Sequence, residues 1–288
     1  MSSFRIVTDS SCDLPAELAA EMGLAVLPLT VAINGRHYRH YPDGREITNE
    51  VFYQILREKK SNPATSGMNL AEFTEIAEKL LQEGEDLLYI GLSSELSGTY
   101  PVGVSALRLL QAKYPERRIM TVDSLCVSAG QGLLCQLCYD RQKTGQTLEE
   151  VWQFAENIKH QIVHTFMVDD IRHLRRGGRL YGSREVPGQL LNVKPLLHVD
   201  SKGRLVTYGR VRGRKSAIEA IANSVENNIL DTSHIVIGHG GCLQDAEHLV
   251  SLLEDQGIRG ARVVEIGPVV GAHSGVGTLA LFYLGKVR

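Results

Sequence analysis

The stretch DLLYIGLSSELSGTYPVGVSALRLLQAKYPERRIMTVDSLCVSAGQGLLCQLCYDRQKTG, residues 86–145, decides the fold class because strand and helix patterns alternate along it. Residues 86–94 and 117–124 are short apolar runs that end in hydroxyl or carboxylate side chains, as buried strands do. Residues 100–115 and 128–145 have the length and composition of helices. Regular alternation of this kind predicts a mainly parallel sheet with helices on both faces.

The same alternation extends toward the beginning of the chain. Residues 4–11 have a strand pattern, and residues 13–23 have a helix pattern with Asp13 as the expected cap and Gly23 after the end. In parallel sheets, ligands bind beyond the carboxyl ends of the strands. The loops expected at this edge are TDSS, TSGMN, SSELSGT and VDSLCVS, and all are rich in hydroxyl groups or small residues.

Two further elements are expected before residue 86. Residues 24–35 predict a strand that ends in a turn at Asn34 and Gly35. Residues 69–84 predict a helix, because Asn69 and Glu72 have the spacing of a capping box and apolar residues follow at helical intervals.

The character of the sequence changes after residue 160. Residues 194–213 predict two strands joined by the turn D-S-K-G, and such a hairpin indicates a mixed sheet. At 288 residues the chain is long enough for two domains. We place their boundary between residues 160 and 170, which gives an N-terminal domain over 1–165 and a C-terminal domain over 166–288.

Composition and charge exclude several classes of protein. Apolar stretches fall short of the roughly 18 residues that a membrane span needs, so no transmembrane segment is expected. The sequence MSSFRIVTDSS has no basic region followed by an apolar region, so we expect a cytoplasmic protein with its five cysteines reduced. A net charge of -2 argues against general binding of nucleic acid.

No motif for a nucleotide or a metal ion is supported. Residues 275–280 formally fit G-x-G-x-x-A, but the acidic residue expected about 20 positions later would lie beyond the last residue, Arg288. No P-loop motif occurs either, and therefore no ATP site is predicted. His160 and His164 have i to i+4 spacing without an H-E-x-x-H pattern, so we expect them to be structural or surface residues, and we expect no cofactor.

Two hydroxyl-rich loops and one histidine are candidates for binding an anion. The loops TSGM (residues 65–68) and SSELSGT (residues 93–99) each open a helix, where N–H groups and hydroxyls can hold a carboxylate or phosphate. Ordinary N-capping is the alternative for each loop. His273 lies in the glycine-rich stretch GPVVGAHSGVG, residues 267–277, where it could contact a ligand or be a core histidine bonded to backbone.

Basic residues are concentrated in two segments, which indicates a local positive patch in an acidic protein. Such a patch suits a phosphate or an acidic partner surface, and a solvated hairpin is the alternative. The segments contain Arg172, Arg175, Arg176, Arg179 and Arg184, and then Lys202, Arg204, Arg210, Arg212, Arg214 and Lys215.

Six motifs in one order resemble the DegV family of bacterial fatty-acid-binding proteins over essentially the whole chain. They are TDSSCDLP (8–15), TSGM (65–68), SSELSGTY within LSSELSGTY (92–100), VDSLCVSAGQG (122–132), HLRRGGR (173–179) and GPVVGAHSGVG (267–277). The resemblance implies a first α/β/α three-layer domain, a second two-layer α/β domain with a mixed sheet, and a long-chain fatty acid between them. It also implies service as the acyl-carrying subunit of a fatty acid kinase, whose separate ATP-binding subunit phosphorylates the carboxylate.

The resemblance also implies which residues hold the carboxylate. Thr65 and Ser97 match the family's carboxylate ligands, and His273 lies close enough to complete the set. Ser66 and Thr99, in the same two loops, are expected as additional contacts.

Basic residues near the head group are expected to face a partner. Arg175 and Arg176 match the residues where a kinase would dock, and we add Arg210 to this phosphate or partner patch.

Two motifs depart from the family pattern. Family members commonly have Thr-Ser-Gln-Pro-Ser where this chain has TSGMN, and Gly-Pro-Gly where it has Gly275-Val276-Gly277. We expect Met68, which is flexible and polarizable, to line an altered pocket.

The predicted function is therefore a lipid-binding carrier without catalysis of its own. The alternative is a phosphotransferase-type enzyme that acts on a small phosphorylated or carbonyl substrate held by the same loops. The missing ATP motif favours the carrier.

Overall fold

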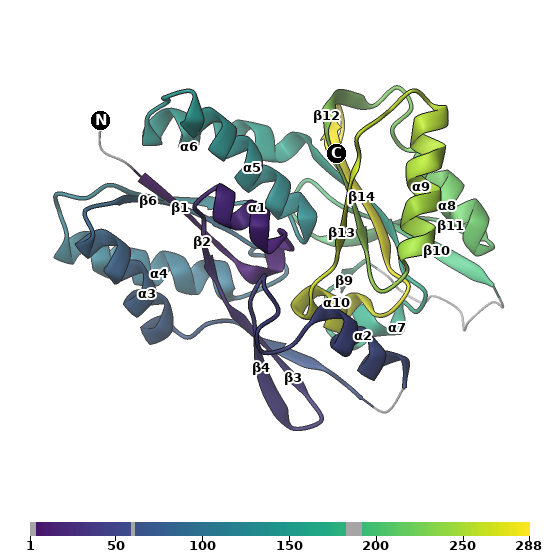
Figure 1. The fold of residues 1–288 in the computed structure, drawn as a ribbon, viewed down its shortest axis with the longest axis horizontal. Helices are drawn as coiled ribbons and strands as arrows, with labels where there is room; N and C mark the ends of the chain where they lie inside the picture. The colour runs from purple at the N-terminus through teal and green to yellow at the C-terminus, as the bar shows by residue number, and fades with distance from the viewer. Residues whose placement is uncertain (1–3, 59–60, 183–191) are drawn as a thin grey trace.

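The computed structural model describes residues 4–58, 61–182 and 192–288, and it contains three sheets (Figure 1). The first is a four-stranded sheet in which every neighbouring pair is parallel. Its strands, in spatial order, are β2 (Ala25–Leu27), β1 (Phe4–Asp9), β6 (Asp86–Gly91) and β7 (Ile119–Asp123). The predicted parallel sheet is confirmed.

Helices cover both faces of this sheet, because its strands are apolar on both sides. Ile6 and Leu88 face the helices α1 (Ala16–Glu21), α5 (Ala129–Lys143) and α6 (Leu148–Ile158). Val7 and Leu87, one position along each strand, face α3 (Leu70–Gln82) and α4 (Thr99–Lys113). Figure 1 shows these two groups of helices on opposite sides of the sheet.

Of the two helix caps predicted from the sequence, the structure confirms one and contradicts the other. Helix α3 begins after Asn69, whose side chain forms the predicted capping box with Glu72. The prediction that Asp13 caps the first helix is wrong. A short 3-10 turn, η1 (Ser10–Cys12), separates β1 from α1, and Asp13 adopts a left-handed conformation at its end. The Asp13 carboxylate instead accepts hydrogen bonds from the Gly267 N–H and the Ser128 hydroxyl.

A small antiparallel sheet was only partly predicted. Its strands, in spatial order, are β4 (Arg36–His40), β3 (Leu29–Ile33) and β5 (Ala64–Ser66). The predicted turn at Asn34 and Gly35 joins β3 to β4, and both residues have positive φ. Helix α2 (Asn49–Arg57) then leads to β5, which pairs with β3 so that Thr65 lies opposite Val31.

The third sheet is mixed, as the hairpin predicted. Its spatial order is β13 (Arg262–Glu265), β12 (Ile229–His239), β14 (Leu279–Gly285), β8 (Ile162–Met167), β10 (Val193–Val199), β11 (Leu205–Arg212) and β9 (Leu180–Tyr181). A 3-10 turn, η2 (Lys159–Gln161), precedes β8. The predicted boundary at residue 165 falls inside β8, and the division into two domains stays a prediction.

Two helices from the C-terminal half of the chain cover one face of the mixed sheet. Helices α8 (Arg214–Asn223) and α9 (Leu243–Asp255) pack on that face in a core that includes Ile237 and Leu281. Phe166, Val236 and Phe282 point to the other face, where Leu96, Ala129 and Leu174 pack against the sheet. The short helices α7 (Arg172–Arg176) and α10 (Pro268–Ser274) lie in the connections next to this face.

Helix α5 contacts both large sheets, which explains why so much of it is buried. Cys135 and Cys138 are fully buried in it, and burial raises the pKa of each thiol above its usual value. Both cysteines are therefore small side chains of the core.

Across the described residues, no helix combines the length and the apolar character needed to cross a bilayer.

We predict that Leu88→Ala lowers the free energy of unfolding by about 2–5 kcal/mol, because it leaves a cavity in a core where Leu88 is 0% exposed. The matched control is Leu109→Ala on α4, where the side chain is 58% exposed and the expected change is about 0.5 kcal/mol or less. Urea unfolding followed by circular dichroism measures both. Equal losses in the two variants would contradict the assignment of this core.

Candidate functional site

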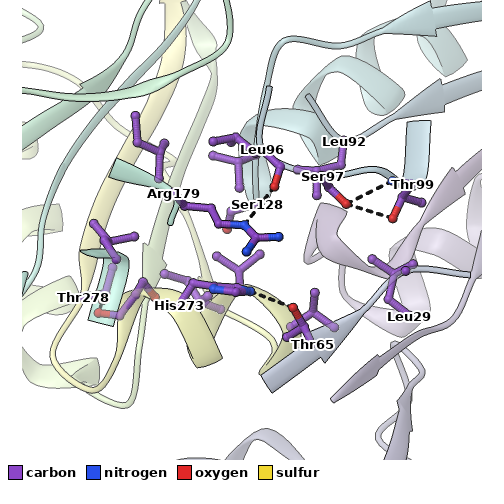
Figure 2. A pocket seen from close by; sticks show the side chains of 18 of the residues that line it. Leu29, Thr65, Leu92, Leu96, Ser97, Thr99, Ser128, Arg179, His273 and Thr278 are labelled. Atoms are coloured by element: carbon purple, nitrogen blue, oxygen red, sulfur yellow. Dashed lines mark hydrogen bonds between the residues drawn. The ribbon is translucent and has the colours of Figure 1, made fainter. Parts of the chain in front are cut away.

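A cavity of about 340 Å³ lies where the open face of the mixed sheet meets the loops of the parallel sheet (Figure 2). This volume is within the range of about 300–1,000 Å³ typical of small-molecule pockets. Most of the lining is apolar, and it includes Leu29, Met68, Leu96, Phe166, Val269 and Phe282. Met68 is buried and lines the cavity, as expected for the altered TSGM loop.

Polar groups gather at one part of this cavity. Thr65, from β5, places its Oγ1 2.7 Å from Nε2 of His273, which comes from α10 (Figure 2). The two residues are 208 positions apart in the chain. Burial, with a smaller effect of the Arg179 cation, lowers the pKa of His273 from 6.5 to about 4. The ring is therefore neutral at pH 7. One of its nitrogens can donate a hydrogen bond, and the other can accept one.

The second hydroxyl-rich loop faces the first. Ser97 Oγ lies 2.9 Å from Thr99 Oγ1 and accepts a hydrogen bond of 3.2 Å from the Thr99 backbone N–H at the start of α4. Gly67 lies directly against Thr99, since a Cβ atom added there would be 2.5 Å from Thr99 Oγ1. Ser97, one residue before the N-cap Gly98, therefore accepts from the first N–H of the helix, and it also lines the cavity.

The structure thus brings five of the predicted site residues into one cavity. Thr65, Ser66, Ser97, Thr99 and His273 all line it. The His273 ring is accordingly a pocket residue rather than a core histidine. That these residues bind a carboxylate remains a prediction.

Arg179 is a site residue that the sequence analysis did not select. Its Nε donates a hydrogen bond of 3.0 Å to the carbonyl of Leu96, and its guanidinium extends into the space between His273 and Ser97 (Figure 2). None of the ion pairs between described residues includes Arg179. The available signal was its place in the HLRRGGR motif, immediately before β9.

The electrostatics of the cavity favour an anion. Among the described residues that line it, none is acidic, and Arg179 is the only arginine or lysine. His164 lines the cavity among Phe166 and Phe282, and burial lowers the pKa of this ring well below 6.5. Its Nε2 accepts a hydrogen bond from Val127 N–H, so this histidine is a neutral, satisfied wall residue. The net charge of the lining at pH 7 is therefore positive.

The two predicted basic segments do not form one patch. Arg175 and Arg176 line a separate groove of about 730 Å³, whose other charged lining residues are Arg57, Arg172, Asp169 and Asp170. Leu174 lines the cavity, whereas its chain neighbours His173 and Arg175 line the groove, so α7 forms the wall between the two spaces. Arg210 is exposed on β11 and lines neither space. Arg184 lies outside the described residues.

The glycines around His273 lie close to side chains from other segments. Gly271 packs against the rings of Phe52 and Tyr53, and a Cβ at Gly275 would lie 2.9 Å from the ring of His173. Gly275 and Gly277 also have positive φ, which favours glycine. These glycines make room for neighbouring side chains. The G-x-G-x-x-A match follows a helix and precedes a strand, the reverse of a dinucleotide-binding motif.

A sequence model of the DegV family, described as an uncharacterised protein family, matches residues 3–286. The chain belongs to the DegV family. A DegV domain-containing protein of Clostridium perfringens is 35% identical over 291 residues. The match covers 100% of this chain and 99% of that protein. A DegV domain-containing protein of Streptococcus pyogenes is 33% identical over 285 residues, with 99% of each chain covered.

Solved structures of other DegV proteins share the fold. A DegV family protein from Thermus thermophilus, described by its fatty acid binding, is 30% identical with a TM-score of 0.86, and 99% of this chain and 100% of that chain are covered. DegV from Bacillus subtilis, described as a fatty acid binding protein, is 27% identical with a TM-score of 0.84 and the same coverage. These likenesses agree with the two-sheet α/β architecture predicted from the sequence.

We predict that Arg179→Ala raises the pKa of His273 from about 4 toward 6.5, because it removes the nearby cation and admits water to the ring. Titration of the histidine ring signals by NMR measures this shift. Arg172→Ala is the control, since Arg172 is exposed and paired with Asp170. An unchanged His273 pKa in Arg179→Ala would show that the guanidinium does not face this ring.

Proposed function

We propose that this DegV protein binds a long-chain fatty acid, with its acyl chain in the apolar part of the cavity and its carboxylate at Thr65, Ser97 and His273. One observation carries this proposal: an apolar cavity holds a cluster of hydroxyl, imidazole and guanidinium groups, and no acidic side chain is among its described lining residues. The fatty acid binding reported for the Thermus thermophilus and Bacillus subtilis relatives supports it.

The energetics of this ligand agree with the cavity. Burial of an acyl chain contributes about 0.8 kcal/mol per CH₂, or on the order of 10 kcal/mol for a long chain before the cost of association is subtracted. A buried carboxylate without partners would cost several kcal/mol. Hydrogen bonds from Thr65, Ser97 and His273, with the charge of Arg179, would offset that cost.

We further propose that the protein presents the bound carboxylate to a separate, ATP-dependent kinase subunit and has no catalytic role itself. The kinase would transfer the γ-phosphoryl group of ATP to a carboxylate oxygen, which gives an acyl phosphate and ADP. The groove of Arg175 and Arg176 lies across α7 from the carboxylate site and would receive the acidic surface of the kinase. This role belongs in the cytoplasm, where ATP is available, and places the ligand between the predicted domains 1–165 and 166–288.

The alternative, an enzyme for a small phosphorylated or carbonyl substrate, fits the cavity less well. Most of the walls are apolar and would leave the polar groups of such a substrate without partners. Native mass spectrometry of the purified protein separates the two. A stoichiometric adduct with the mass of a fatty acid supports the carrier, whereas a protein that also fails to take up added palmitate or oleate supports the enzyme.

We predict that Thr65→Ala combined with Ser97→Ala weakens fatty acid binding about 100-fold, because two hydrogen bonds to a charged group are lost. Displacement of a fluorescent fatty acid from delipidated protein measures the affinity. Ser94→Ala combined with Thr74→Ala is the matched control, because these hydroxyls line neither the cavity nor the groove. Unchanged binding in the Thr65 and Ser97 variant would overturn the carboxylate site.

Reversal of charge in the groove should separate binding from phosphorylation. Arg175→Glu combined with Arg176→Glu should retain fatty acid affinity and lower the rate of acyl phosphate formation by the kinase subunit at least about tenfold, through repulsion of the partner. Trapping of acyl phosphate with hydroxylamine measures the rate. Arg108→Glu combined with Arg259→Glu changes the same charge at exposed sites outside the groove and should have no effect. Equal rates in both double variants would exclude this groove as the docking surface.

A further inference from the structure

Asp13 is a buried carboxyl group that joins two walls of the cavity. One oxygen, Oδ1, accepts a hydrogen bond of 2.9 Å from the Gly267 backbone N–H, and the other, Oδ2, accepts one of 2.6 Å from the Ser128 hydroxyl. Gly267 is the residue from which α10 begins, and Ser128 is the residue from which α5 begins. The carboxylate therefore lies at the amino-terminal ends of two helices, where negative charge is favoured.

Both contacts lead directly to the ligand site. Helix α10 carries His273 and also Val269 and Val270, which line the cavity. Ser128 lines the cavity itself and has the backbone angles φ 57° and ψ -144°, which a serine rarely adopts without support. Asp13 thus connects the segment that positions the imidazole with a second wall of the same cavity.

The side chains around Gly267 pack closely against its backbone. A Cβ atom added to Gly267 would be 2.2 Å from Cε1 of His40 and 2.7 Å from Oδ1 of Asp13. The preceding residue, Ile266, accepts a hydrogen bond of 2.8 Å from the hydroxyl of Tyr53. The position of the α10 start is therefore set by side chains from three separate segments.

We propose that Asp13 is a positioning residue for the fatty acid site: its carboxylate holds the starts of α5 and α10 so that His273 is directed at the ligand. This inference rests on the proposed function, because it concerns the geometry of that same site. A charged acceptor binds N–H and O–H donors more strongly than a neutral one does. Ligand affinity should therefore depend on the ionisation of Asp13.

The protonation of Asp13 falls in an accessible pH range. Burial raises its pKa from 3.8 to about 7, against the opposing effect of the Ser128 and Gly267 hydrogen bonds. The titratable groups that face it are Asp9 from β1, Cys12 from η1, His40 from β4 and Tyr53 from α2. Burial keeps the last three neutral at pH 7, since it raises the pKa of Cys12 and Tyr53 and lowers that of His40 to about 4. Burial also raises the pKa of Asp9.

The raised pKa separates stability from function. The unfolded chain loses the Asp13 proton near pH 4, and the folded chain loses it near pH 7. The free energy of unfolding therefore falls as the pH rises from about 4 to 7. Above pH 7 the whole stabilising contribution of the protonated Asp13 is lost. Asp13→Asn removes this charge while an amide oxygen can still accept from Gly267. The variant should melt at a higher temperature than the wild type at pH 8, yet bind the ligand less tightly.

The test uses the delipidated full chain and the fluorescent fatty acid cis-parinaric acid, titrated between pH 6 and 8.5. The wild type should lose about tenfold in affinity as the pH falls through 7, the equivalent of one charge-assisted hydrogen bond. Asp13→Asn should bind at pH 8 as weakly as the wild type does at pH 6, and its affinity should not change with pH. His273, with a pKa of about 4, titrates below this range, and a transition caused by the ligand carboxyl or by Asp9 would persist in Asp13→Asn.

Asp123→Asn is the matched control, because this carboxylate accepts from the N–H groups of Ser94 and Leu125 and does not bond to either helix start. It should retain the wild-type pH profile. A wild-type affinity that is constant from pH 6 to 8.5 overturns the inference even if Asp13→Asn fails to fold. So does an Asp13→Asn variant with the wild-type profile. A wild type that binds no fatty acid at any pH overturns the proposed function as well.

Discussion

The open apolar face of the mixed sheet is the constraint on which the rest of the structure depends. Helices α8 and α9 cover one face, and the other face, with Phe166 and Phe282, would be exposed to water without the N-terminal elements. Helix α5 and the loops of the parallel sheet cover it. A cavity remains between these loops and the sheet, and the proposed ligand site lies in it. The hydrophobic effect thus drives the packing of the two sheets, and the cavity is the part of this interface that the side chains leave unfilled.

The polar side chains of the cavity come from four separate segments of the chain. Thr65 depends on the pairing of β5 with β3, and His273 depends on where α10 begins. Ser97 depends on the start of α4, and Arg179 on the turn before β9. Neutral donors and one guanidinium surround a space in which no described lining residue is acidic. This arrangement is complementary to an anion, as the proposed carboxylate ligand requires.

Much of the fold could be predicted because its signals are local. The alternation over residues 86–145 predicted the parallel sheet, and the Asn69 and Glu72 pair predicted the start of a helix. The small antiparallel sheet was incompletely predicted, since β5 is only three residues long and depends on pairing with a strand more than 30 positions earlier. Asp13 was misread as a helix cap, because its actual partners, Ser128 and Gly267, are 115 and 254 positions away.

The sequence by itself determined most of the strands and helices of the parallel sheet, which loops carry hydroxyl groups, and to which family the chain belongs. Those properties depend on backbone preferences and side-chain spacing within a few residues. Only the tertiary structure decided that Arg179 faces the site while Arg175 and Arg176 line a separate groove. It also decided that the glycines beside His273 accommodate neighbouring side chains. Such outcomes depend on which sheet faces pack together, and this is a property of the whole chain rather than of any window along it.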